Sequence, residues 1–84
     1  MVRITDLRIL EDFRLKLSFS DNTSQVIDFK PFIGNDELTG KLADKDFFKR
    51  VKIYENGRGI YWPNEYDFCP DFLRYHIDQK QNAA

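Results

Sequence analysis

The chain has 84 residues, with 15% aromatic side chains, 13 basic residues against 14 acidic ones, and a net charge of −1. A chain of this length has room for one core and buries only about 60 to 65% of the surface that it exposes when unfolded. The balanced charge excludes the strongly basic footprint of a dedicated nucleic-acid binder, and a single cysteine excludes an internal disulfide. We expect one domain over residues 1–78 and a frayed tail over residues 79–84.

Targeting and membrane signals are not found in this sequence. The first ten residues, "MVRITDLRIL", mix apolar and charged side chains, unlike a signal peptide. No apolar run approaches the roughly 20 residues that a membrane span needs. These features predict a cytoplasmic protein with no membrane segment.

The first third of the chain alternates in the manner of strands. Residues 2–9 change phase near Thr5-Asp6, which predicts a β-bulge there. The stretch "FRLKLSF" places four apolar side chains on one face, namely Phe13, Leu15, Leu17 and Phe19. The turn formers "SDNTS" and the apolar "QVIDF" that follow predict a partner strand.

Two short helices are expected in the middle of the chain. Asn35 or Asp36 could cap a brief helical turn, which Gly40 keeps short. Asp44 is the predicted N-cap of a helix of about two turns in "ADKDFFKRV". Its apolar residues would pack on the sheet: Phe47, Phe48 and Val51.

The pair Asn56-Gly57 is the strongest local signal, because both positions of a two-residue type I′ hairpin turn need positive φ. Counting outward from this turn, Ile53 faces Ile60 and Lys52 faces Tyr61. Alternation then places four residues on the core face: Val51, Ile53, Ile60 and Trp62. The other face holds Lys52, Tyr54, Gly59 and Tyr61.

A C-terminal helix follows the hairpin. Pro63 ends the strand, Cys69 stands at the N-cap position, and Pro70 suits the first helical residue. An apolar stripe is predicted along the helix: Phe72, Leu73, His76 and Ile77. The predicted fold class is α+β, a small antiparallel-rich sheet of three strands, then a helix, a two-stranded hairpin and the C-terminal helix.

Catalytic and metal-binding groups are sparse. Cys69 and His76 could form a nucleophile pair, but about two helical turns, roughly 10 Å, would separate them. Asp67 and Asp71 could approach each other; we favour Asp67 accepting backbone N–H bonds in a tight turn and Asp71 complementing the helix end. We expect no enzyme activity, no catalytic residue, no metal and no cofactor.

Two kinds of binding surface remain open. Exposed tyrosines are typical interface anchors, so the candidate partner-binding residues are Lys52, Tyr54, Tyr61 and Tyr66. A weak basic cluster beside stacking aromatics could instead hold nucleic acid through Lys45, Lys49, Arg50, Lys52 and Arg58. We favour a small protein partner, with a homodimer as a variant of the same idea and weak nucleic-acid binding as the alternative.

The stretch "DKDFFKRVKIYENGRGIYWPNEYDFCPDFL" and the upstream "LKLSFSDNTSQVIDFKPFI" resemble the bacterial domain of unknown function 2442. The family pattern "L-x-D-x-x-x-F" is met by Leu42, Asp44 and Phe48. The pattern "W-P-N-G-x-D-x-x-P-x-x-L" is met by Trp62, Pro63, Asn64, Asp67, Pro70 and Leu73. The upstream pattern is met by Leu15, Leu17, Phe19, Asp21, Asp28, Pro31, Phe32 and Ile33. This sequence departs from the patterns at Asn22, Glu65, Tyr66 and Cys69.

The resemblance implies a small α+β fold and no established activity. It also implies that the gene lies beside one for another small protein, in an arrangement like a toxin-antitoxin pair. The leading hypothesis is therefore a non-enzymatic interaction or regulatory protein that neutralises or regulates such a neighbour, as one member of a toxin-antitoxin-like gene pair.

Overall fold

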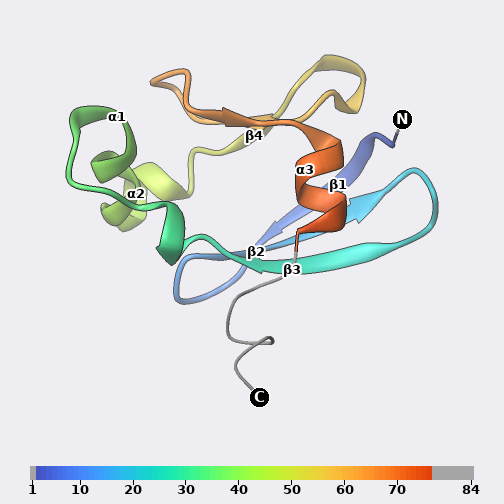
Figure 1. Ribbon diagram of the computed structural model, residues 1–84, viewed down its shortest axis with the longest axis horizontal. Coiled ribbons are helices and arrows are strands. Elements are labelled where there is room, and N and C mark those ends of the chain that lie inside the picture. The colour runs from blue at the N-terminus through green and yellow to red at the C-terminus, as the bar shows by residue number, and fades with distance from the viewer. Residues whose placement is uncertain (1, 77–84) are drawn as a thin grey trace.

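The structure is a computed structural model that describes residues 2–76, and it contains two three-stranded antiparallel sheets (Figure 1). The strands are β1 (Ile4–Ile9), β2 (Arg14–Phe19), β3 (Ser24–Asp28), β4 (Lys52–Ile53), β5 (Ile60–Tyr61) and β6 (Asp67–Phe68). The helices are α1 (Glu37–Gly40), α2 (Lys45–Phe48) and α3 (Pro70–Tyr75), with 3-10 turns η1 (Lys30–Phe32), η2 (Lys41–Ala43) and η3 (Glu55–Gly57). The predicted α+β class is confirmed.

Sheet A has the order β1-β2-β3, and its first strand carries the predicted bulge. The pairing of β1 with β2 shifts between Ile4 and Asp6, which leaves Thr5 as the extra residue. Beyond the shift, Leu7 lies opposite Leu17. The bulge thus restores the apolar side chains of β1 to the face that β2 buries.

The alternation predicted for the second strand is confirmed. Leu15 and Leu17 are completely buried and Phe19 nearly so, while Lys16 between them is exposed. Phe13 precedes the strand, in the turn from β1, and is half-buried. One face of sheet A is therefore core and the other faces solvent.

Sheet B has the order β4-β5-β6, and the predicted register of its first two strands is confirmed. Lys52 lies opposite Tyr61, and Ile53 lies opposite Ile60. Ile60 and Trp62 are completely buried, as expected for the core face. Turn chemistry and alternation led to the same register from independent rules.

The hairpin turn itself is wider than the predicted two residues. Asn56 and Gly57 do adopt positive φ, at 64° and 70°. The Gly57 N–H, however, donates to the carbonyl of Tyr54 at 2.9 Å and forms η3, so four residues separate Tyr54 from its partner Gly59. A Cβ on Gly57 would collide with the carbonyl oxygen of Ile4, so the turn lies directly against β1.

Strand β6 was not expected from the sequence, which indicated only a turn before the last helix. Phe68 pairs with Ile60, and Asp67 pairs with Tyr61 of β5. The chain reverses between β5 and β6 through a bond of 2.9 Å from the Trp62 N–H to the Tyr66 carbonyl. The predicted two-stranded hairpin is thus a three-stranded sheet.

Helix α2 is one turn of four residues, shorter than the two turns predicted. Its predicted N-cap is confirmed, because the Asp44 carboxylate accepts the Asp46 N–H at 2.9 Å. The helix ends early because the N–H groups of Arg50 and Val51 bond back in a tight turn that leads into β4. Phe48, at the end of the helix, is buried.

The start of α3 is as predicted. Cys69 occupies the N-cap position in an extended conformation, without a side-chain bond, and Pro70 is the first helical residue. Asp36 likewise caps α1, where its carboxylate accepts the Thr39 N–H at 2.7 Å.

Of the apolar stripe predicted along α3, Leu73 is completely buried and His76 is half-buried. Phe72 is 45% exposed. His76 stands after the helix in an extended conformation, so helical spacing does not apply to it. Ile77, the domain boundary at residue 78 and the predicted tail over residues 79–84 lie outside the described residues.

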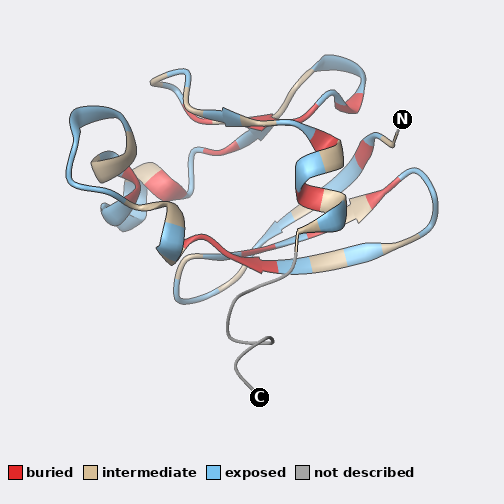
Figure 2. Cartoon of the chain, viewed as in Figure 1, coloured by how far each residue is buried: buried red, intermediate tan, exposed pale blue. Residues whose placement is uncertain are grey.

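The core lies between the two sheets, whose facing sides hold most of the buried residues (Figure 2). Helix α3 lies between the sheets at one end, and α1 and α2 lie at the other (Figure 1). The buried apolar residues are Ile4, Leu15, Leu17, Phe19, Ile27, Phe29, Leu42, Phe48, Val51, Ile60, Trp62 and Leu73. Within residues 2–76, no helix is long and apolar enough to cross a membrane.

Candidate functional site

The outer face of sheet B carries three of the four predicted partner-binding residues. Lys52 and Tyr54 are two positions apart and so point to the same side of the sheet. Tyr61 lies opposite Lys52 in the neighbouring strand. The rings of Tyr54 and Tyr61 stack with centroids 4.4 Å apart and planes at 23°. Asp67 of β6 lies opposite Tyr61 and joins the same face. We call Lys52, Tyr54, Tyr61 and Asp67 the tyrosine face.

The tyrosine face is held in one arrangement by a hydrogen bond. The Tyr54 hydroxyl donates to Oδ2 of Asp67 at 2.9 Å. This bond, followed by burial and the negative charge of Asp67, raises the pKa of Tyr54 above its ordinary value. The expectation that Asp67 accepts backbone N–H bonds in a tight turn is therefore wrong: its partner is a phenol across the sheet.

A glycine allows the third strand to reach the tyrosine face. Gly59 has a φ of 139°, and a Cβ there would collide with the carbonyl oxygen of Phe68. Only glycine adopts this conformation without strain and lets the backbones approach so closely. Gly59 thus places β6, and with it Asp67, against the hairpin.

Tyr66 does not belong to the tyrosine face. It lies on the core side of sheet B, half-buried, with its ring 6.1 Å from Trp62 and 5.1 Å from Phe68. Its hydroxyl donates to the Phe32 carbonyl at 3.2 Å. Burial, with a contribution from the charge of Asp36, raises its pKa. The structure brings together Lys52, Tyr54 and Tyr61 and separates Tyr66 from them.

A second feature is a hollow of about 760 Å³ beside α2. Its walls are the loop between β1 and β2 and one side of α2, and its lining residues are Ile9, Leu10, Glu11, Asp12, Phe13, Lys45, Phe48 and Lys49. From the sequence, Lys45 and Lys49 were candidate nucleic-acid-binding residues, and no residue of the loop was a candidate for any site. We call these eight residues the α2 hollow.

Residues 4–79 match a family described as proteins of unknown function, DUF2442. The chain belongs to the DUF2442 family. No curated protein and no solved structure matches the chain. Membership confirms the resemblance inferred from the sequence motifs, and it assigns no activity.

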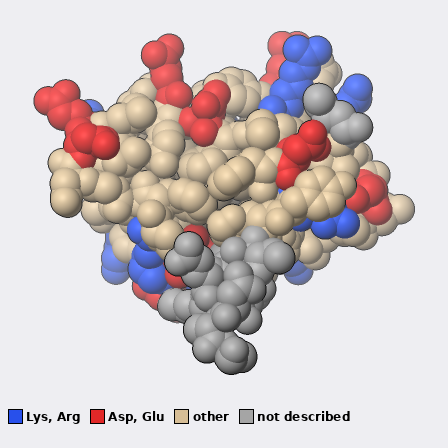
Figure 3. Space-filling view, in the orientation of Figure 1, with Lys and Arg blue, Asp and Glu red and all other residues tan. Residues whose placement is uncertain are grey.

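The basic residues proposed for nucleic-acid binding do not form one patch in this DUF2442 domain. Lys45, Lys49, Arg50, Lys52 and Arg58 are all exposed. Lys45 lies on α2, however, whereas Arg58 lies in the hairpin turn, at the other end of the molecule in Figure 1. On the face drawn in Figure 3, acidic and basic side chains are interspersed and much of the surface is uncharged.

Cys69 and His76 stand at opposite ends of α3 in the DUF2442 domain. Six helical residues separate them, and Cys69 is exposed. The His76 ring contacts Phe32 and Phe72, with centroids 5.5 and 5.6 Å away. Neither Cys69 nor His76 lines the α2 hollow.

Asp67 and Asp71, which the sequence analysis considered as a possible acidic pair, form hydrogen bonds to different partners. Asp67 accepts from Tyr54, while Asp71 accepts the Val2 N–H at 3.4 Å. Residues 2–76 contain no group of three histidine, cysteine or acidic side chains that could hold a metal ion.

Proposed function

We propose that this DUF2442 domain is a non-enzymatic interaction protein that binds a small partner protein through the tyrosine face. The observation that carries this proposal is the stacked pair Tyr54 and Tyr61, fixed by Asp67 on a sheet face that none of the helices within residues 2–76 covers (Figure 1). Tyrosines of this kind are enriched among the residues that dominate binding energy. Because the pair is already ordered, a partner pays little conformational entropy to use it.

The surroundings of the two rings also suit a protein partner. Both tyrosines are half-buried, while Lys52 and Asp67 beside them are exposed and carry opposite charges. Aromatic residues within a polar, charged rim are typical of non-obligate protein interfaces. A partner that places a carboxylate near Lys52 and a cation near Asp67 would match this face.

The family resemblance suggests which partner to test. Its implication is a neighbouring gene for a second small protein, and we propose that this domain neutralises or regulates that protein. We place the interaction in the cytoplasm, because an exposed, unpaired Cys69 suits a reducing compartment.

Nucleic-acid binding remains the alternative function and has less support. A protein that binds single-stranded nucleic acid usually has a continuous cationic groove beside aromatic side chains on which the bases stack. Here Lys52 is the only one of the five candidate basic residues on the tyrosine face, and Lys45 and Arg58 lie at opposite ends of the molecule.

The test is co-expression of the chain with the product of its neighbouring gene, followed by purification through a tag on one partner and measurement of the complex mass. We expect a stoichiometric complex. Tyr61→Ala should raise its dissociation constant at least about tenfold, as loss of a central aromatic anchor does. Lys52→Glu, which reverses an exposed charge without removing packing, should also weaken it.

Tyr75→Ala is the matched control, because Tyr75 is an aromatic residue of α3 that is 66% exposed and lies off the tyrosine face. Its complex should match that of the unchanged chain. A complex that is equally strong with Tyr61→Ala and Lys52→Glu would refute the tyrosine face as the binding site. Self-association in place of a heteromeric complex, or nucleic acid that stays bound at moderate salt, would refute the partner assignment.

A further inference from the structure

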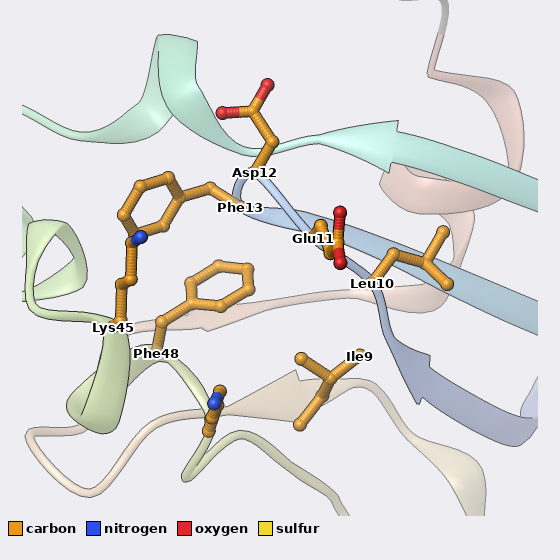
Figure 4. A pocket seen from close by; sticks show the side chains of 8 residues that line it. Ile9, Leu10, Glu11, Asp12, Phe13, Lys45 and Phe48 are labelled. Carbon is orange, nitrogen blue, oxygen red and sulfur yellow. The ribbon is translucent and has the colours of Figure 1, made fainter.

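The α2 hollow is a second candidate site, separate from the tyrosine face. Side chains from the β1–β2 loop and from α2 face each other across it (Figure 4). Its volume of about 760 Å³ lies within the range of roughly 300 to 1,000 Å³ that is usual for small-molecule sites. None of its lining residues belongs to the tyrosine face.

The loop wall of the hollow has an unusual backbone. Asp12 and Phe13 both adopt left-handed conformations, with φ of 62° and 60°. This conformation is uncommon for a residue with a bulky side chain and costs roughly 1 to 2 kcal/mol. It turns the Phe13 ring onto Phe48, where the two rings meet edge to face with centroids 5.3 Å apart.

The apolar part of the hollow is therefore a right-angled corner made by two aromatic rings. Phe13 is half-buried and Phe48 is buried, and Ile9, at 38% exposure, adds an aliphatic side chain. A flat apolar group can lie against the accessible side chains of Phe13 and Ile9, with its edge toward Phe48.

The charged side chains of the hollow differ in whether they are already paired. The Asp12 carboxylate is bound by the ammonium of Lys30 at 2.8 Å. Lys45, the first residue of α2, and Lys49, its C-cap residue, have no ion-pair partner within residues 2–76, and neither has Glu11. The side chains of the hollow that form no ion pair are thus two cations, Lys45 and Lys49, and one carboxylate, Glu11. Their summed charge is positive.

We propose that the α2 hollow binds a small aromatic carboxylate. The flat ring of the ligand packs against Phe13 and Ile9, where they border the buried Phe48, and its carboxylate bonds to the ammonium groups of Lys45 and Lys49. The apolar corner disfavours a bare inorganic anion, and the positive balance disfavours a cation. This site is independent of the proposed partner binding and stands or falls separately.

The test is a titration of the full isotope-labelled chain with 2-naphthoate, followed by two-dimensional NMR. 2-Naphthamide, which has the same ring and no charge, is the matched ligand control. We expect naphthoate to shift the amide signals of residues 9–13 and 45–49, and naphthamide to bind about tenfold more weakly, as loss of a charge-assisted hydrogen bond implies.

Two variants change the charge of the hollow in opposite directions without removing packing. The double variant Lys45→Gln, Lys49→Gln should weaken naphthoate binding about tenfold and leave naphthamide binding unchanged. Glu11→Gln should strengthen naphthoate binding by about threefold, because it removes a repelling carboxylate. Lys16→Gln, on the exposed face of sheet A, is the matched control and should have no effect.

Several results would overturn the assignment. These are the absence of saturable shifts at millimolar naphthoate, shifts centred outside the two walls, and equal binding of naphthoate and naphthamide. Unchanged or weaker naphthoate binding by Glu11→Gln would also overturn it, since a purely structural role of this exposed residue predicts no gain.

Discussion

Replacing Trp62 by phenylalanine tests the central feature of the fold. Trp62 is completely buried between the sheets, with its ring 5.7 Å from that of Phe29. Its Nε1–H donates to the Phe48 carbonyl at 2.9 Å and so ties sheet B to α2. Phenylalanine keeps an aromatic ring in the same place but loses three heavy atoms and the N–H donor.

The magnitude follows from these two losses. A residual cavity of roughly 40 Å³ costs about 1 kcal/mol at about 24 cal/mol per Å³. The Phe48 carbonyl would lose its better donor but keep a long bond of 3.4 Å from the Val51 N–H, so we assign about 1 kcal/mol to the lost hydrogen bond, near the lower end of the range. The variant should be less stable by about 2 kcal/mol, against roughly 4 to 12 kcal/mol expected for a domain of 84 residues.

The assay is urea unfolding followed by far-ultraviolet circular dichroism, because the variant has lost the only tryptophan of the chain. The midpoint should fall while the slope with urea stays constant, as expected for a loss of stability without a change in the surface exposed. Tyr75→Leu, which replaces the ring of a residue that is 66% exposed by a smaller aliphatic group, is the control and should change the free energy of unfolding by less than about 0.5 kcal/mol. An equally small change for Trp62→Phe would mean that the indole is not enclosed, and the arrangement of the two sheets around it would be wrong.

Three further changes test other parts of the structure. Gly59→Ala should lower the free energy of unfolding by about 2 kcal/mol or more in urea, because the new Cβ would meet the Phe68 carbonyl at a strained φ; a neutral result would contradict the close approach of β6. Asp67→Asn should lower the pKa of Tyr54 in an alkaline absorbance titration, and an unchanged pKa would contradict their hydrogen bond. Folding raises the pKa of Tyr54 above its ordinary 10.0, so the protonated phenol stabilises the fold fully below pH 10. This stabilisation is lost as the pH rises through the pKa of the folded state. The fall in stability at alkaline pH should therefore be smaller in Asp67→Asn. Asp44→Ala should cost about 1 kcal/mol in thermal unfolding, whereas no loss would show that the N-cap of α2 contributes nothing.

The parts of the fold that the sequence predicts correctly depend on local rules. The strand alternation around Leu15 and Leu17 and the pairing of Ile53 with Ile60 follow from residues close together in the chain. The same holds for the cap of α2 by Asp44. In each case neighbouring side chains and turn chemistry agree with the tertiary environment.

The errors arise where distant contacts decide the outcome. Strand β6 has only two residues, Asp67 and Phe68, too few for alternation to be visible, and it exists because Gly59 allows a close approach. The helical spacing predicted for His76 is wrong because α3 ends at Tyr75. Tyr66 looked like an exposed tyrosine because nothing local indicates that the reversal after Trp62 turns its side chain toward the core.

The two candidate sites also differ in how far local sequence rules predict them. Three members of the tyrosine face follow from the hairpin register, and the fourth, Asp67, needed the unexpected third strand. The α2 hollow depends on consecutive left-handed residues at Asp12 and Phe13, which neither residue type favours strongly enough to predict. Its two walls are more than thirty positions apart in the chain, so no local pattern joins them.

The family motifs identify the architecture rather than either site. Leu42, Phe48, Trp62, Pro70 and Leu73 are buried. Two polar motif residues have structural bonds as well: Asp44 caps α2, and the Asn64 amide donates to the Leu38 carbonyl at 2.9 Å.

Asp67 is the motif residue that belongs to the tyrosine face, and Phe48 is the one that lines the α2 hollow. The other side chains of both sites, among them Tyr54, Tyr61 and Lys45, lie at positions that the motifs leave open. A chain can therefore match the family by folding in this way while differing from its relatives in what it binds. The experiments on the tyrosine face and the α2 hollow test properties of this chain that membership of the family does not determine.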